Sequence, residues 1–321
     1  APGSPDRPAI PWERLGPPLA LLRAMREHGR RGLRLWGLTQ AAEAIGPDDV
    51  SCAAPAGAMV QPNPDARTGT ASLLSALLGA ACQERADLWG GVLELPRSVD
   101  EWEGILSSAL LACDGDSLVL RGGTCLARRL RPAVLRSGAE PLRLRGTVLL
   151  CGDLAATDAP LVHWLAACGA EHVVAAGPSA DQIAGAPGLL QELRDLGVRL
   201  TSVPCELAAT DGVTAPLTRL LKEASPALAA VVLVAAGAVL PAAPNEEELA
   251  SAAERRTAVT RALEAAVRDV PLDVFLVLDR APLPWEEGAH AADAVSSVLL
   301  EQITASRRAR GAAAPPGRGP P

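Results

Sequence analysis

The chain has 321 residues, of which 49% are hydrophobic, and its formal net charge at pH 7 is −7. A chain of this length and apolar content can bury one large core or two modest ones, and we expect two lobes. Basic residues are spread along the sequence apart from the runs RRLR at 128–131 and RRAR at 307–310, so the charge pattern does not suggest a nucleic-acid groove, and we expect no nucleic-acid partner.

Targeting signals are also missing from the sequence pattern. No charged segment precedes an apolar core of the kind found in signal peptides. No apolar run reaches the roughly 18 residues that a membrane-spanning helix requires. We therefore expect a cytoplasmic protein with no membrane partner.

The seven cysteines form no CxxC pair, and several lie in apolar runs, which indicates buried core thiols. His163, Cys168 and His172 could be considered as metal ligands. Gly169, however, should end the helix that carries the first two and place His172 on the next strand. We therefore predict no metal site.

The first 140 residues predict a smaller α/β lobe. Helices are expected at 17–29, 71–85 and 99–115, strands at 33–38 and 90–96, and a loop at 46–67. The segment SLVLRGGTCLARRL, residues 117–130, predicts a β-hairpin that turns at Gly122 and Gly123. The two ends of the chain, 1–17 and 311–321, are rich in Pro, Gly and Ala, and we interpret them as linkers within a longer polypeptide.

From Gly146 onward, strands and helices alternate. The apolar runs predict strands at 146–151, 171–176, 199–204, 228–236 and 272–278, and the amphipathic runs between and after them predict helices at 159–168, 188–197, 212–224, 246–267 and about 290–308. Strands rich in Val, Leu and Ala that alternate with helices imply a parallel sheet covered on both faces. The expected fold class is therefore a doubly wound α/β lobe.

The helix after the first of these strands has two further features. Leu161, Trp164, Leu165 and Cys168 fall at the spacing of one helical stripe, which we expect to face the sheet. Asp158 stands immediately before the helix and is predicted to be its N-cap.

Several phrases occur together in an order that resembles one family. They are ERADLWGGVLELP at 84–96, SLVLRGGTCLARRLRP from 117, RLRGTVLLCG from 143, LAAVVLVAAG from 228 and LDVFLVL at 272–278. In this order they resemble the ketoreductase region of modular type I polyketide synthases over roughly residues 18–310. The resemblance implies a truncated Rossmann-like structural subdomain at 18–140 and a catalytic subdomain of the short-chain dehydrogenase/reductase fold at 141–310.

The resemblance also implies NADPH-dependent reduction of a β-ketoacyl chain on an acyl carrier protein, but the cofactor positions are altered. Of the glycines in the family's phosphate-binding turn, only Gly152 remains, and Ala155 and Asp158 occupy the other two positions. Like charges about 4 Å apart cost on the order of 4 kcal/mol at an effective dielectric constant near 20, roughly a thousandfold in affinity. Pro178 lies in the turn that should hold an arginine for the 2′-phosphate, and Glu206 matches an Asp near the adenine.

The catalytic positions implied by the resemblance are replaced as well. The serine falls at Arg280, the tyrosine at Asp293, the asparagine of the proton relay at Ser297 and the lysine at Arg256. The sequence contains no tyrosine at all, and its only lysine is Lys222. An ionised Asp cannot donate the proton, and Arg cannot exchange one near neutral pH.

We therefore expect a catalytically inactive ketoreductase-like domain with no cofactor and a structural role. Its partners would be the neighbouring polyketide synthase domains, including the acyl carrier protein. The structural subdomain should lack its opening strand, and the family's last strand and substrate-covering helices should be missing after RRARG. Three alternatives stay open: an NADPH-dependent reductase, an epimerase of the α-carbon, and an unrelated α/β binding protein.

Overall fold

The structure is a computed structural model in which the chain divides into two compact units. One unit comprises Ala1–Arg131, Ala238–Glu254 and Ala281–Pro321, and the other comprises Pro132–Gly237 and Arg255–Arg280. We call them unit 1 and unit 2 and describe each by itself. The structure describes residues 14–28, 34–40, 72–80, 89–96, 98, 100, 102, 104–112, 117–127, 129, 142–152, 154, 158–205, 226–235, 245–279 and 291–313.

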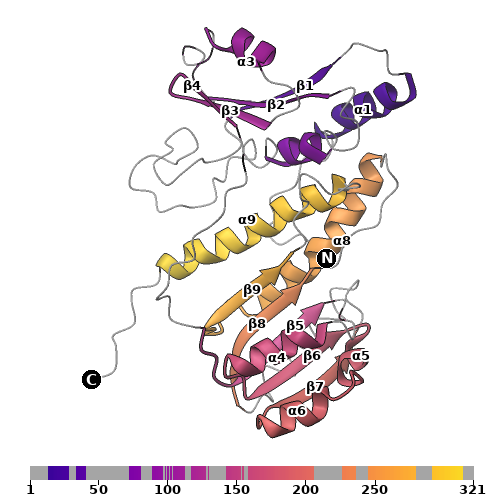
Figure 1. Ribbon diagram of the computed structural model, residues 1–321, viewed down its shortest axis with the longest axis vertical. Helices are drawn as coiled ribbons and strands as arrows, with labels where there is room; N and C mark the ends of the chain where they lie inside the picture. The colour runs from indigo at the N-terminus through magenta and orange to yellow at the C-terminus, as the bar shows by residue number, and fades with distance from the viewer. Residues whose placement is uncertain are drawn as a thin grey trace, which may run out of the picture. The chain divides into compact units, whose positions relative to one another are not determined.

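Unit 2 contains a parallel sheet of five strands in the order β7-β6-β5-β8-β9. The strands are β5 (Thr147–Gly152), β6 (His172–Gly177), β7 (Arg199–Pro204), β8 (Leu228–Val234) and β9 (Val274–Leu278) (Figure 1). All four neighbouring pairs run parallel. Each strand was expected from its apolar run, and the parallel pairing is confirmed.

Helices cover both faces of this sheet. Helices α4 (Ala159–Ala167), α5 (Ala180–Ala184) and α6 (Leu189–Asp195) pack on the face that includes Val148 and Leu150. The second half of α8 (Glu246–Ala266) packs on the opposite face, with Leu263 against Leu149 and its neighbours. Because both faces are buried, β5 is apolar at nearly every position rather than at every second one. The doubly wound α/β class is thereby confirmed.

The orientation predicted for α4 needs a correction. Trp164 is 41% exposed, whereas Val162 and Leu165 are fully buried and Ala166 is nearly so. The residues Val162, Leu165 and Ala166 therefore form the centre of the buried stripe. Helix α4 is apolar around most of its circumference, so its sequence alone does not show which apolar side chains face the sheet.

Unit 1 contains a smaller, mixed sheet in the order β1-β2-β3-β4. Strands β1 (Leu35–Gln40), β2 (Trp89–Leu95) and β3 (Ser117–Arg121) are parallel, and β4 (Thr124–Ala127) pairs with β3 in the antiparallel sense. Gly122 and Gly123 both have positive φ, 52° and 74°, which a tight turn between two strands favours. The hairpin predicted at these glycines is confirmed.

Helices from both ends of the sequence build the rest of unit 1. Helix α1 (Gly16–His28) and the helical residues 72–80 pack on one face of the sheet, and α3 (Leu106–Ala112) packs on the other. A further cluster joins these N-terminal helices to the first turns of α8 and to α9 (Ala291–Ala313) through Leu19, Leu77, Leu249 and Leu299. Helix α8 therefore contributes to both units.

The start of α8 is held by a reciprocal pair of hydrogen bonds. The backbone N–H of Asn245 donates to Glu248 Oε2, and the backbone N–H of Glu248 donates to Asn245 Oδ1, both at 2.8 Å. This capping box satisfies two donors at the helix terminus.

Some expectations fall outside the described residues. These are the loop at 46–67, the helix at 212–224, residues 1–13 of the first linker and residues 314–321 of the last. The short helix α5 was not expected from the sequence. None of the described helices is both long enough and apolar enough to cross a membrane.

Candidate functional site

The candidate site is the edge of the five-stranded sheet at which its strands end. From β5 the chain builds outward to β6 and β7, then returns to the other side of β5 for β8 and β9. The direction of winding reverses between β5 and β8, and in open parallel sheets ligands bind outside the carboxyl ends of the strands at such a point. Gly152 is the last residue of β5 and lies directly at this point.

The strand ends at this point are packed too closely to accept a side chain. Gly152 has φ +154°, and a β-carbon added to it would overlap the carbonyl oxygen of Val234 on β8. Gly177, the last residue of β6, has φ +158°, and a β-carbon there would overlap the carbonyl oxygen of Gly152. Packing of the strands is therefore a sufficient reason for glycine at both positions.

Asp158 occupies the N-cap position of α4, as predicted, but its side chain makes no capping hydrogen bond. Two features account for this difference. The backbone of Asp158, at φ −89° and ψ 2°, is outside the extended region typical of N-caps, and the second residue of the helix is Pro160, which has no N–H to donate. The carboxylate thus adds negative charge at the helix start without satisfying its N–H groups.

The end of β6 carries no cation either. It is followed by Pro178 and Ser179, and Asp181 in the first turn of α5 accepts a hydrogen bond of 2.5 Å from Ser202 Oγ on β7. The described residues that directly follow β5 and β6 thus carry the carboxylates of Asp158 and Asp181 and no basic side chain. This charge pattern does not fit the phosphates of a dinucleotide, whose binding requires N–H donors and cations.

Arg256, which the family resemblance aligns with the lysine, is held by a carboxylate. Its Nη2 forms an ion pair and hydrogen bond with Oδ1 of Asp279, the residue that directly follows β9. The side chains of Arg256 and Asp279 are 2% and 19% exposed. Sequence reasoning missed Asp279, since the contact joins residues 23 positions apart. Asp279 belongs to no recognisable motif, so the sequence around it does not indicate that it pairs with Arg256.

Two of the remaining predicted residues belong to unit 1. Asp293 and Ser297 are one turn apart on α9 in unit 1, and Ser297 Oγ donates a 2.9 Å hydrogen bond to the backbone carbonyl of Asp293. Ser297 therefore bonds to its own helix. Ala155, Glu206 and Arg280 lie outside the described residues.

Two titratable groups near the sheet have shifted pKa values. Burial, with a smaller contribution from Cys205, raises the pKa of the Cys151 thiol to about 12. Burial, with a smaller contribution from Arg199, lowers the pKa of His172. Cys151 is thus a protonated core thiol at neutral pH, as expected for a structural cysteine.

The histidines considered as metal ligands have other contacts. His163 Nε2 lies 2.7 Å from Glu192 Oε2 on α6, and His172 Nε2 lies 2.9 Å from Thr201 Oγ1 on β7. The expectation that Gly169 separates the helix from the next strand is confirmed, because α4 ends at Ala167 and β6 begins at His172. Within the described ranges, no three His, Cys, Asp or Glu side chains gather as metal ligands would.

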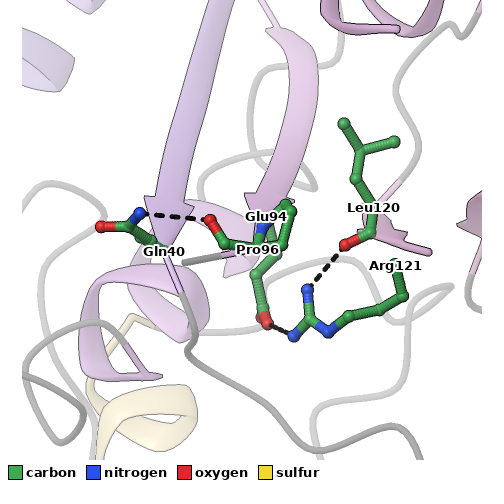
Figure 2. A network of polar contacts seen from close by, with 5 residues as sticks. All are labelled: Gln40, Glu94, Pro96, Leu120 and Arg121. Carbon is green, nitrogen blue, oxygen red and sulfur yellow. Dashed lines mark hydrogen bonds and ion pairs between the residues drawn. The ribbon is translucent and has the colours of Figure 1, made fainter. Parts of the chain in front are cut away.

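A similar arrangement occurs at the carboxyl edge of the sheet in unit 1 (Figure 2). Arg121, at the end of β3, forms an ion pair with Glu94 near the end of β2, and their side chains are 12% and 3% exposed. Arg121 Nη1 also donates to the carbonyl of Leu120 at 2.8 Å, and Gln40 at the end of β1 donates to the carbonyl of Pro96 at 3.1 Å. In each unit, an arginine and a carboxylate meet where the parallel strands end.

Comparisons with known proteins agree with this fold. The family model described as KR domain matches residues 146–315, more than half of the chain. The chain is 30% identical to polyketide synthase GfsA of Streptomyces halstedii over 96% of its length, and 29% identical to the pikromycin polyketide synthase component PikAIII of Streptomyces venezuelae over 92%. It spans only 4% and 18% of these two relatives.

Solved structures give the same result. A structure of an A1-type ketoreductase is 28% identical, with a TM-score of 0.65 over 92% of this chain and 60% of that one. The first ketoreductase of the tylosin PKS is 25% identical, with a TM-score of 0.68 over 94% and 62%. The chain therefore belongs to the KR domain family, the ketoreductase region of modular polyketide synthases.

Proposed function

We propose that this chain is a catalytically inactive ketoreductase domain that serves as a structural spacer in a modular polyketide synthase. The observation that carries the proposal is the ion pair of Arg256 with Asp279. Arg256 stands at the position aligned with the catalytic lysine, and its positive charge is paired with the Asp279 carboxylate. Its guanidinium does not exchange protons near neutral pH.

The proton donor of the reaction is also missing. The chain contains no tyrosine, and the aligned residue, Asp293, is a carboxylic acid that would be an acceptor rather than a donor when ionised. Ser297, aligned with the asparagine of the relay, directs its hydroxyl proton to the carbonyl of Asp293. A reduction that ends in protonation of an alkoxide therefore has no donor at the aligned positions.

NADPH is proposed not to bind. Among the described residues that follow β5 and β6, Asp158 and Asp181 carry carboxylates and none carries a basic side chain, at the edge where the cofactor's phosphates would lie. Gly152 does not count against this proposal, because close packing with Val234 accounts for glycine there without a nucleotide.

A spacer role requires only that the fold persists. Two sheets with well-packed cores survive the loss of loop chemistry, since core packing and site chemistry depend on different residues. The proposed partners are the neighbouring domains of the synthase, including its acyl carrier protein, whose separation a folded domain of fixed size would maintain.

A titration with NADPH tests this proposal. The melting temperature of the 321-residue chain is measured with NADPH up to millimolar concentrations, beside an intact ketoreductase of the family as positive control. For the control, ligand at 100 times its Kd adds about 2.7 kcal/mol of stability and raises the melting temperature by several degrees. We expect no shift for this chain, and a shift similar to that of the control would refute the proposal.

An epimerase would not need the nicotinamide, so a second assay addresses it. A 2-methyl-3-ketoacyl carrier protein deuterated at the α-carbon is incubated with the chain, and loss of deuterium is followed by mass spectrometry. We expect washout at the background rate, because the resemblance implies that the family's serine and tyrosine handle this proton, and Arg280 and Asp293 stand at those positions. Washout above background would make the domain an epimerase.

A further inference from the structure

The ion pair of Arg256 with Asp279 lies where β9 ends. Arg256 comes from α8, and its guanidinium is almost completely inaccessible at 2% exposure. A buried guanidinium requires an anion close by, because removal of its charge from water is not otherwise compensated. Asp279 directly follows β9 and supplies that anion. The contact thus joins α8 to the carboxyl end of a strand, the part of the fold where ligands usually bind.

We propose that Arg256 forms an anion-binding site for a carboxylate-class ligand, and that the Asp279 carboxylate occupies this site as a tethered ligand. This inference deepens the proposed function and rests on it. Once Asp279 is removed, the site is open to a free carboxylate of the same size.

The side chain of Asp279 is partly exposed to solvent. It is 19% exposed, whereas the side chain of Arg256 is 2% exposed, so Asp279 is the more solvent-exposed member of the pair. Replacement of Asp279 by glycine removes the carboxylate and its β-carbon together. Formate is the smallest anion with a carboxylate group, so we expect it to replace the group that this substitution removes. Phosphate is larger than the carboxylate group that Asp279 supplies, and we expect it to stabilise the variant less than formate does.

Chemical rescue by formate tests the inference. The Asp279→Gly variant of the full 321-residue chain is melted in sodium formate and in sodium chloride of equal ionic strength. At a formate concentration ten times its Kd, the folded state is favoured about 11-fold, which raises the melting temperature by roughly 3–5 °C above the value in chloride. Sodium phosphate, matched in ionic strength, is the arm that tests the size limit.

Three controls isolate the site. The wild-type chain and the Asp269→Gly variant, which loses an exposed aspartate, should melt at the same temperature in formate and chloride. The double variant Arg256→Met with Asp279→Gly keeps the space but lacks the cation, so formate should not stabilise it. Equal melting of Asp279→Gly in formate and chloride, or an equal formate effect in all variants, would overturn the inference.

Two further outcomes are informative. If Asp279→Gly folds only in formate, the rescue is itself the expected result. If Asp279→Gly folds in neither salt, the Asp279→Ser variant is tested instead, since the serine hydroxyl can still accept a hydrogen bond from Arg256. If formate does not stabilise Asp279→Ser more than chloride does, the inference is overturned. Binding of NADPH to the wild-type chain would refute the proposed function, whereas indifference of the Asp279 variants to formate would refute only the tethered ligand.

Discussion

Replacement of Gly152 by alanine tests whether strand packing, rather than a nucleotide, requires glycine at the end of β5. The new β-carbon would overlap the carbonyl oxygen of Val234, and the backbone at φ +154° strains any other residue. The strained conformation costs about 1–3 kcal/mol. Backbone shifts that relieve the overlap cost about 1–3 kcal/mol more. The sum, roughly 2–6 kcal/mol, is a large part of the about 5–15 kcal/mol that stabilises a typical domain.

Two other glycines separate the terms of this sum. Gly197 has φ +72° and nothing within 4 Å of an added β-carbon, so Gly197→Ala should cost only the backbone strain, about 1–2 kcal/mol. Gly185 has ordinary helical φ of −80°, and an added β-carbon would make only ordinary contacts with the carbonyl oxygens of Asp181 and Gln182, at 3.5 and 3.6 Å, so Gly185→Ala should be neutral or stabilising by up to about 1 kcal/mol. Urea unfolding without any nucleotide measures all three. A Gly152→Ala variant as stable as Gly185→Ala would refute the packing explanation.

The other predictions concern buried charges and titration. Glu94→Ala should destabilise unit 1 by about 3–5 kcal/mol in urea unfolding, because Arg121 loses its carboxylate, and replacement of both residues by leucine should recover most of that loss. The pKa of His172 is lowered in the folded state, so below about pH 6.5 the unfolded chain binds more protons than the folded chain, and the free energy of unfolding decreases as the pH falls through that value. His172→Gln should weaken this pH dependence, which is measured as the urea midpoint between pH 5 and 7.5. Because its pKa is raised to about 12, the buried Cys151 thiol should resist alkylation by iodoacetamide at pH 8 in the folded chain, while the exposed Cys125 should be alkylated. Peptide mass mapping measures both sites, and alkylation of the two at equal rates would contradict the burial of Cys151.

Local sequence pattern determined most of the secondary structure of unit 2. The apolar runs at 146–151 and 171–176 became β5 and β6, since a strand buried on both faces needs an apolar residue at every position. Gly122 and Gly123 marked the hairpin of unit 1 for a similar reason, because the residues of a tight turn depend on backbone conformation within a few positions. The family resemblance, too, rested on phrases that can be read along the chain.

Only the tertiary structure decided which side chains meet. Trp164 and Val162 are both apolar residues of one short helix, and the sheet alone selects the buried one. Asp158 was correctly placed at the start of α4, but the backbone angles and Pro160 determined that its side chain does not cap the helix.

The contacts that carry the proposals are the least visible from sequence. Arg256 pairs with Asp279, and Arg121 with Glu94, across 23 and 27 positions. Patterns of hydrophobicity repeat over two to four residues and so report on one element at a time. An ion pair between two elements depends on how the chain returns to the same edge of a sheet, which is a property of the folded molecule as a whole.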